Sequence, residues 1–175
     1  MSLSPVDRGL LRIVGSPAKD LKAFKEGVYL AGLSGRDIDA LIDQSCTDRL
    51  ILAQGFLADA ERAMRSRPPM RRAAVGRCYY AMYQAGRAVV FYQTRGDDHE
   101  KHSVLPDHLP SDLPNVDRWK NSLKDARLRR NMADYDPYPA TDLDFQSAAA
   151  HLTAEARAFL GEVRTYLLAK GCSLV

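Results

Sequence analysis

Hydrophobic residues recur at every third or fourth position along most of the chain, and this period predicts helices rather than strands. The first helix is expected to begin at "SPAKDL", with Ser16 as its N-cap and Pro17 as its first residue. Gly32 is expected to end this helix. Its apolar face contains Leu21, Phe24, Val28 and Ala31.

Another N-terminal helix is predicted at "LSGRDIDALI", where Ser34 and Asp37 have the spacing of an acidic capping box. A longer helix follows, and we expect it to stop before Pro68 and Pro69 because proline cannot continue a helix. The apolar side of this longer helix is formed by Leu50, Ala53, Leu57, Ala60 and Met64.

The segment from Arg71 to Arg95 is apolar on nearly all sides, which is typical of a central helix with several neighbours. Gly96 is expected to end it. One side has only small side chains, namely those of Ala74, Cys78, Ala81, Ala85 and Ala88. Such a stripe lets another helix approach closely, and on this basis we predict that the chain forms a homodimer.

The rest of the chain is predicted to contain a loop and two more long helices. Asp97 to Pro114 is predicted to be a loop with a short helical turn, and a helix from Val116 to Ala133 follows with Asn115 as its cap. The last helix is expected to open with Thr141 as its cap and to close at Gly171.

These elements predict an all-α fold. We expect an antiparallel up-and-down bundle of four long helices, preceded by short N-terminal helices. Residues 1–45 would form an N-terminal helical extension and residues 46–171 a helical bundle domain.

The charge of the chain is mildly basic and unevenly distributed. Its 175 residues include 25 Lys and Arg against 22 Asp and Glu, which gives a net charge of +3 and an isoelectric point of about 8.8. Two groups of arginines stand out: Arg65, Arg67, Arg71, Arg72 and Arg77, and Arg127, Arg129 and Arg130. They fit either solvated helix faces or a surface that binds anions, and the sequence leaves both interpretations open.

Cysteine and hydropathy patterns place the chain in a broad class. Cys46, Cys78 and Cys172 are widely spaced and odd in number, which disfavours zinc binding or a disulfide framework. No apolar run reaches the ~18 residues that span a bilayer, and the N-terminus lacks the apolar core of a signal peptide. We expect a cytoplasmic protein with no membrane association, no metal and no cofactor.

Arg130 occupies an unusual position on the helix predicted for residues 116–133. It shares the spacing of an otherwise apolar face formed by Trp119, Leu123, Ala126 and Ala133. A guanidinium turned toward a core needs an anion, and Asp134 lies one turn further on. The pair is interpreted either as a structural tie at the helix end or as part of a functional site.

Two blocks of sequence resemble the HEPN superfamily of small α-helical proteins. One is "RRAAVGRCYYAMYQAGRAVVFYQTRG" followed by "KHSVL", which is similar to the long second helix of that family. The other is "ARLRRNMADYDPY", which resembles the Arg-x-x-Ala-Asp-Tyr-Asp ending of one branch. The resemblance covers roughly residues 47–170, and residues 1–45 lie outside it.

The resemblance implies a bundle that dimerises so that its arginine-bearing helix ends face each other. Catalytic members are metal-independent ribonucleases with an Arg-x(4–6)-His motif, in which histidine transfers protons and arginine holds the phosphate. This chain has Tyr135 five residues after Arg130 and Asp134 five residues after Arg129, so the motif histidine is absent. The resemblance places the candidate catalytic group at Arg130, Asp134 and Tyr135, the last also being the nearest match to a tyrosine that some nucleotidyltransferase partners modify.

A second set of residues is expected to bind RNA or a nucleotide around this motif. It consists of Arg77, Tyr80, Arg87, His102, Arg127, Arg129 and Asn131. His99 and His102 in "HEKH" have helical metal-ligand spacing but no third ligand, so we expect no metal there.

Three functional hypotheses follow from the sequence. The chain is a HEPN-type dimer with a degenerate motif that binds RNA or a nucleotide in a toxin–antitoxin or defence setting. Alternatively, it is a non-catalytic helical partner that docks a nucleotidyltransferase-like protein. In the third hypothesis it is a plain bundle with a structural Arg–Asp pair.

Overall fold

The computed structural model describes residues 4–172, and all of their regular secondary structure is helical. This confirms the all-α prediction. The chain divides into two compact units, Met1–Leu41 and Ile42–Val175, so the division falls at 41/42 rather than at the 45/46 boundary expected from sequence. Among the described residues, no helix combines the length and apolarity needed to traverse a bilayer.

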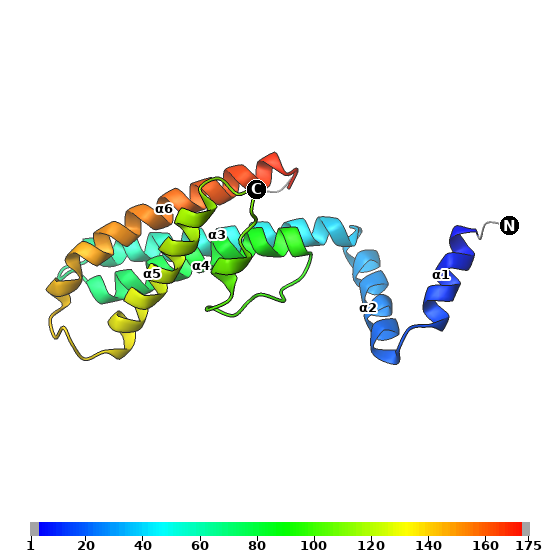
Figure 1. Ribbon diagram of the computed structural model, residues 1–175, viewed down its shortest axis with the longest axis horizontal. Coiled ribbons are helices and arrows are strands. Elements are labelled where there is room, and N and C mark those ends of the chain that lie inside the picture. Colours follow the sequence, from blue (N-terminus) through cyan, green and yellow to red (C-terminus); the bar gives the residue numbers. More distant parts are fainter. Residues whose placement is uncertain (1–3, 173–175) are drawn as a thin grey trace. The chain divides into compact units, whose positions relative to one another are not determined.

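The larger unit is a bundle of long helices joined by loops and short 3-10 turns (Figure 1). Its elements are α3 (Ile38–Arg65), α4 (Arg71–Thr94), η1 (Leu105–His108), α5 (Val116–Tyr135), η2 (Asp142–Phe145) and α6 (Gln146–Ala169). The division between the two units lies within the first turns of α3.

Helix α4 is the centre of this bundle, and α5 and α6 pack along it. Its small side chains Ala74, Cys78, Ala81, Ala85 and Ala88 are all completely buried. On the α6 side the Cys78 thiol lies 3.4 Å from the hydroxyl of Thr153. The prediction that a small-residue stripe admits a close neighbour is correct, but the stripe is covered within the chain. It therefore offers no surface to a second copy, and that argument for a homodimer fails.

Helix α5 contributes the apolar face that its sequence predicted. Trp119, Leu123, Ala126 and Ala133 are each at most 6% exposed. The Trp119 ring packs against Phe159 of α6 with 4.9 Å between ring centroids. The helix runs to Tyr135, two residues further than expected, because the Asp136 N–H still reaches the carbonyl of Met132.

The smaller unit contains α1 (Pro5–Val14) and α2 (Ala18–Ser34). The apolar pattern did not predict α1, which opens with a capping box between Ser4 and Asp7. The predicted cap of α2 was wrong, because the Ser16 hydroxyl donates to the carbonyl of Arg12 at the end of α1 instead. Gly32 lies inside α2, and Gly35, with φ of +67°, ends it.

Helix α3 joins two segments that were predicted to be separate. Asp37 caps it by accepting a hydrogen bond of 2.7 Å from the Ala40 N–H, whereas Ser34, its predicted partner, is the last residue of α2. Nothing between residues 38 and 65 breaks the helical hydrogen bonds, so the two segments form one helix, and it ends at Arg65, before Pro68 and Pro69 as expected.

Two other helix ends also differ from expectation. Arg95, not Gly96, adopts the left-handed conformation that ends α4, with φ of 54°. The last helix is preceded by the turn η2, and Thr141 donates its hydroxyl to Asp144 instead of capping a backbone N–H. The loop predicted between α4 and α5 is confirmed, and η1 is its short helical turn.

Candidate functional site

The Arg130 side chain extends from α5 toward Tyr80 of α4 and is 18% exposed. Its Nε is 2.7 Å from a carboxylate oxygen of Asp134, so the expected ion pair forms. Its Nη2 donates to the Tyr80 hydroxyl at 2.8 Å, and its Nη1 donates to the Asn131 side chain at 3.2 Å. The predicted residues Arg130, Asp134, Asn131 and Tyr80 are thus brought together.

Two tyrosine rings flank the same guanidinium. The Arg130 Cζ lies 5.3 Å from the centroid of Tyr80 and 4.9 Å from that of Tyr135. Burial by itself would lower the pKa of Arg130, but the Tyr135 side chain, Tyr80 and Asp134 outweigh it and raise that pKa. Arg130 is therefore permanently charged, and its charge is already compensated inside the protein.

A pocket of about 290 Å³ opens beside this pair. It is lined by Ala73, Gly76, Arg77, Tyr80 and Asp134. Gly76 is buried, and a Cβ added there would stand only 3.4 Å from the Asp134 carboxylate, so glycine leaves room for the end of α5 to approach α4.

His102 joins the site from the loop after α4. Its Nδ1 shares a hydrogen bond with the Tyr79 hydroxyl, and its ring stacks on Tyr83 with 4.1 Å between centroids. Burial, followed by the positive charges of Arg130, Arg127 and Arg87, lowers the pKa of His102 from its ordinary value of 6.5. The lowered pKa favours the neutral form of the His102 imidazole.

The predicted binding arginines differ in how their charge is compensated. Arg129 pairs with Asp125 at 2.7 Å, and Arg87 pairs with Asp97. Among residues 4–172, Arg77 and Arg127 contact no carboxylate, and the guanidinium of Arg77 lies over the ring of Phe56. The site defined by Arg77, Tyr80, His102, Arg127 and Arg130, called the α4–α5 site below, thus has two uncompensated positive charges.

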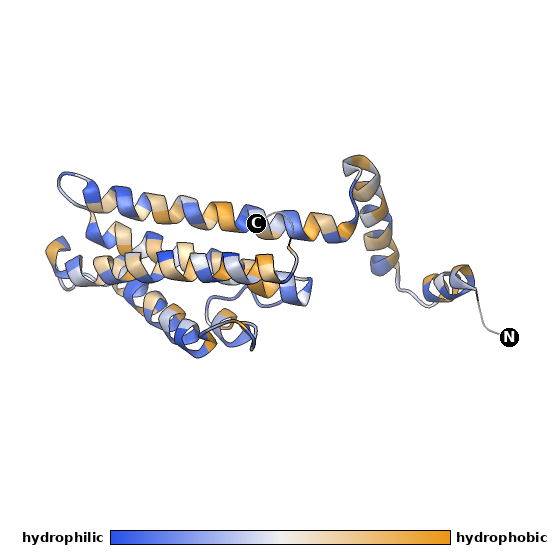
Figure 2. Cartoon of the chain, turned by 90° about the horizontal axis from the view of Figure 1, so that it is seen from above, coloured by the Kyte–Doolittle hydropathy of each residue, from blue (hydrophilic) through white to orange (hydrophobic). Residues whose placement is uncertain are grey.

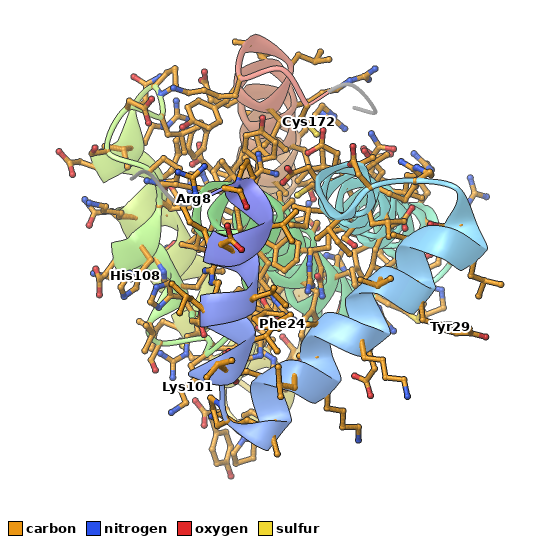
Figure 3. The ribbon with its side chains drawn as sticks, turned by 90° about the vertical axis from the view of Figure 1, so that its right-hand side faces the viewer. Arg8, Phe24, Tyr29, Lys101, His108 and Cys172 are labelled. Atoms are coloured by element: carbon orange, nitrogen blue, oxygen red, sulfur yellow. The ribbon has the colours of Figure 1, made fainter. Side chains whose placement is uncertain are left out.

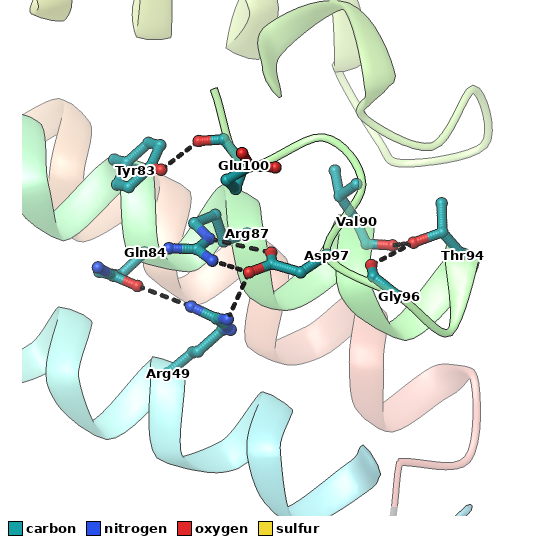
Figure 4. A network of polar contacts seen from close by, with 9 residues as sticks. All are labelled: Arg49, Tyr83, Gln84, Arg87, Val90, Thr94, Gly96, Asp97 and Glu100. Atoms are coloured by element: carbon teal, nitrogen blue, oxygen red, sulfur yellow. Dashed lines mark hydrogen bonds and ion pairs between the residues drawn. The ribbon is translucent and has the colours of Figure 1, made fainter. Parts of the chain in front are cut away.

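Arg87 belongs to a separate network at the other end of α4 (Figure 4). Both Arg87 and Arg49 of α3 bind the carboxylate of Asp97, and Arg49 also reaches the Gln84 side chain at 3.4 Å. The Tyr83 hydroxyl donates to the carbonyl of Glu100 in the same region. This geometry gives Arg87 the role of anchoring the loop, which differs from its predicted role in ligand binding.

The segment after α5 is held by Arg72 and Asp142, and the sequence, which placed Arg72 only in a group of arginines, assigned this role to neither residue. Arg72 donates to the carbonyls of Ala133 and Asp136 at 2.9 and 3.0 Å. Asp142 accepts the N–H groups of Arg71 and Arg72, each at 2.9 Å, and so caps α4 from a distant part of the chain. Long-range caps of this kind have no local sequence signal.

The remaining histidines form no metal site. His99 and His108 stack face to face with 3.6 Å between ring centroids. Within residues 4–172 no group of three metal-ligating side chains is placed to hold an ion.

Within residues 4–172 the α4–α5 site combines the guanidinium groups of Arg77 and Arg127, which have no carboxylate partner, with the compensated one of Arg130. Arg77 and Tyr80 line the open pocket. These features suit phosphate and a stacked base. No protein-family model, curated protein or solved structure matches this chain.

Proposed function

We propose that this chain is a HEPN-like helical protein that binds the phosphates of RNA or of a nucleotide at the α4–α5 site. The observation that supports this most directly is Arg77, which lines a pocket of about 290 Å³ and has no carboxylate partner among residues 4–172. Arg127 also lacks a carboxylate partner there, and its charge acts on His102 of the same site. Arginine is the residue best suited to hold phosphate, because its planar fork donates two parallel hydrogen bonds. An antiparallel order of the long helices, homodimerisation and a toxin–antitoxin or defence setting belong to this proposal.

Cleavage of RNA is the further step in this proposal. His102 lies in the α4–α5 site although it is not part of the Arg-x(4–6)-His motif, and its neutral imidazole can accept a proton. The imidazole would take the proton of the attacking 2′-hydroxyl and, as imidazolium, return it to the 5′-oxygen that leaves, while Arg130 holds the scissile phosphate after exchanging Asp134 for it. Metal-free incubation with RNA, comparing the wild type with Arg130→Ala, tests this step, and cleavage that survives the substitution would remove Arg130 from it.

Binding is tested with a fluorescein-labelled single-stranded RNA and fluorescence anisotropy over a salt series. Arg127→Gln should weaken binding similarly for all sequences and reduce the slope of log K against log salt by about 0.7, the value for one phosphate contact on a single strand. Arg164→Gln is the matched control, because Arg164 is an exposed arginine of α6. Arg164 is also distant from the α4–α5 site, because its neighbour Glu162 contacts Asn115 at the opposite end of α5.

A second readout reports on the same site without requiring RNA. The positive charge of Arg127 contributes to the lowered pKa of His102, so Arg127→Gln should raise that pKa toward 6.5 in an NMR titration. Arg164→Gln should leave it unchanged. Equal RNA affinity of Arg127→Gln and the wild type, with His102 shifted as expected, would reject the binding proposal while confirming the geometry.

The alternative function, docking of a nucleotidyltransferase-like protein, is favoured by a different feature of α5. Leu128, Met132 and Tyr135 are 60%, 38% and 69% exposed and are spaced so that they share its outer face. A double substitution, Leu128→Ser with Met132→Ser, should abolish capture of such a partner and leave RNA anisotropy unchanged. The opposite result would favour RNA as the ligand.

A further inference from the structure

The smaller unit leaves its apolar side chains uncovered. No residue of α1 or α2 is buried, and Figure 2 shows hydrophobic positions along both helices. Val6, Val14 and Val28 are 70%, 83% and 75% exposed. Phe24 and Tyr29 leave α2 on different sides and are 47% and 71% exposed (Figure 3).

An apolar groove of about 640 Å³ lies along α2 and the first residues of α3. Its floor includes Ala23, Gly27 and Ala31, which are spaced by four and therefore lie on one side of α2. A Cβ added at Gly27 would come no closer than 3.8 Å to Ile38, so the groove is open at this point. Small residues in such a row allow the backbone of another helix to come close.

Helix α1 has a surface that complements this groove. Val6, Leu10 and Val14 are spaced by four, and all are more than half exposed. Arg8 on its polar side contacts no carboxylate in the part of the chain that the structure describes, while Asp37 lines the groove. A helix with this apolar row and a positive flank matches both the lining and the charge of the groove.

The connection between α1 and α2 holds α1 away from its own groove. Only residues 15–17 separate the two helices, and α1 does not pack along α2. The Gly15 N–H donates to the Leu11 carbonyl at 3.2 Å, and the Ser16 hydroxyl donates to that of Arg12 at 2.7 Å. These bonds continue the end of α1 into the linker and oppose a hairpin in which α1 would fold back on α2.

We infer that α1 of one copy of this chain fills the groove of a second copy, and that α1 of the second copy fills the groove of the first. Each chain offers both the helix and the groove, so a twofold arrangement covers both surfaces at once and closes. The inference is independent of the α4–α5 site and of the small-residue stripe that α6 covers.

The exposed apolar area agrees with a second copy as the occupant. The large hydrophobic residues of the two surfaces that would meet are Val6, Leu10 and Val14 of α1 and Phe24, Val28 and Ile38 of the groove, and their exposed fractions together equal about 3.7 complete residues. At roughly 60–120 Å² of apolar area for each complete side chain, one copy can bury roughly 220–450 Å². Specific dimers bury about 800 Å² per partner in total, so these surfaces account for about a quarter to a half of a stable interface.

The test measures the mass of the full chain by light scattering over a micromolar concentration series. Gly27→Leu places a bulky side chain in the groove while retaining a good helix former, and it should halve the mass. Gly32→Leu is the matched control, because Gly32 is an exposed glycine on another side of α2 where an added Cβ would meet no atom within 4 Å, and it should keep the wild-type mass. Equal masses for the wild type and both variants would overturn the inference.

Cross-linking identifies which chain supplies the helix. The three native cysteines are buried, so cysteines introduced by Leu10→Cys in one copy and Ala31→Cys in another should be the pair that oxidises. A disulfide between the two chains in the mixture supports the exchange. A chain that carries both substitutions, Leu10→Cys and Ala31→Cys, serves as the comparison. If the mixture gives no disulfide between chains and this double variant forms one within a single chain, α1 occupies its own groove and the inference is wrong.

Discussion

The two compact units differ sharply in how they are stabilised. Helix α4 alone buries thirteen residues, including Tyr79, Met82 and Val89, whereas α1 and α2 together bury none. The bundle therefore draws its stability from its own core. The smaller unit has only caps, local hydrogen bonds and the uncovered apolar faces of its two helices.

This difference has a physical consequence for the smaller unit. Isolated helices of 10 and 17 residues are marginal in water, because nucleation is costly and most helical stability comes from packing of an apolar face. The capping box of Ser4 and the cap at Asp37 contribute about 1 kcal/mol each. Covering the apolar faces contributes much more, which is why we expect α1 and α2 to be stable only against another surface.

The largest expected effect comes from truncating a phenylalanine in each unit. Phe159 of α6 is completely buried and packs against Trp119, so Phe159→Ala should lower the free energy of unfolding by about 3–5 kcal/mol. Phe24→Ala in α2 removes a side chain that is 47% exposed, and it should change that free energy by less than about 1 kcal/mol at protein concentrations that favour the monomer.

Chemical denaturation followed by circular dichroism measures both variants. At high protein concentration Phe24→Ala should become more costly, because the groove it lines is then filled. If the two variants lose equal free energy of unfolding under dilute conditions, the smaller unit has a core of its own. The two units would then not differ in how they are stabilised.

A smaller effect is expected at the long-range cap of α4. Asp142→Ala removes the acceptor for two backbone N–H groups and should cost about 1–2 kcal/mol. Burial by itself raises the pKa of Asp142, but the N–H groups of Arg72 and Arg71 and the Arg71 guanidinium outweigh burial and lower it below its ordinary value of 3.8. The stabilisation is therefore fully present above that value and is lost as the pH falls below it, through the folded-state pKa.

The difference in unfolding free energy between the wild type and Asp142→Ala should accordingly shrink as the pH falls below about 4. Asp144→Ala is the control, since Asp144 is an exposed carboxylate two residues away that accepts only the Thr141 hydroxyl. A difference that stays constant down to about pH 2 would mean that the charge of Asp142 does not stabilise the end of α4.

Much of the bundle was predictable because its cause is local. The period of apolar residues placed α4, α5 and α6 and both segments that α3 joins, and the spacing of Arg130 with Trp119, Leu123 and Ala126 correctly put its guanidinium at the edge of the core. The ion pair with Asp134 followed from helical geometry alone.

The features that escaped prediction depend on contacts between distant segments. The Asp142 cap lies some seventy residues from the N–H groups that it accepts, and Arg72 reaches Asp136, just after α5, over a similar separation. His102 was among the predicted binding residues, but its hydrogen bond with Tyr79, which forms because the loop folds back onto α4, was not predicted. Helix ends were misplaced where the backbone, not a residue type, decided the stop: α5 continues because the Asp136 N–H reaches the Met132 carbonyl, and α4 ends at Arg95, in the left-handed conformation, in place of Gly96.

The smallest expected effect on stability comes from replacing one exposed helical glycine by alanine in each unit. Gly161 in α6 and Gly32 in α2 are exposed, helical and without any atom within 4 Å of an added Cβ. Alanine at either position reduces the entropy lost on folding, and Gly161→Ala should raise the free energy of unfolding of the bundle by about 0.5–1 kcal/mol. Gly32→Ala adds the same propensity to a helix that does not share the bundle's core. It should therefore increase helical circular dichroism in dilute solution and slow amide exchange in α2, while the main unfolding transition stays unchanged. A shift of that transition by Gly32→Ala equal to the shift by Gly161→Ala would show that both units unfold together, and the contrast between them would then be one of exposure but not of stability.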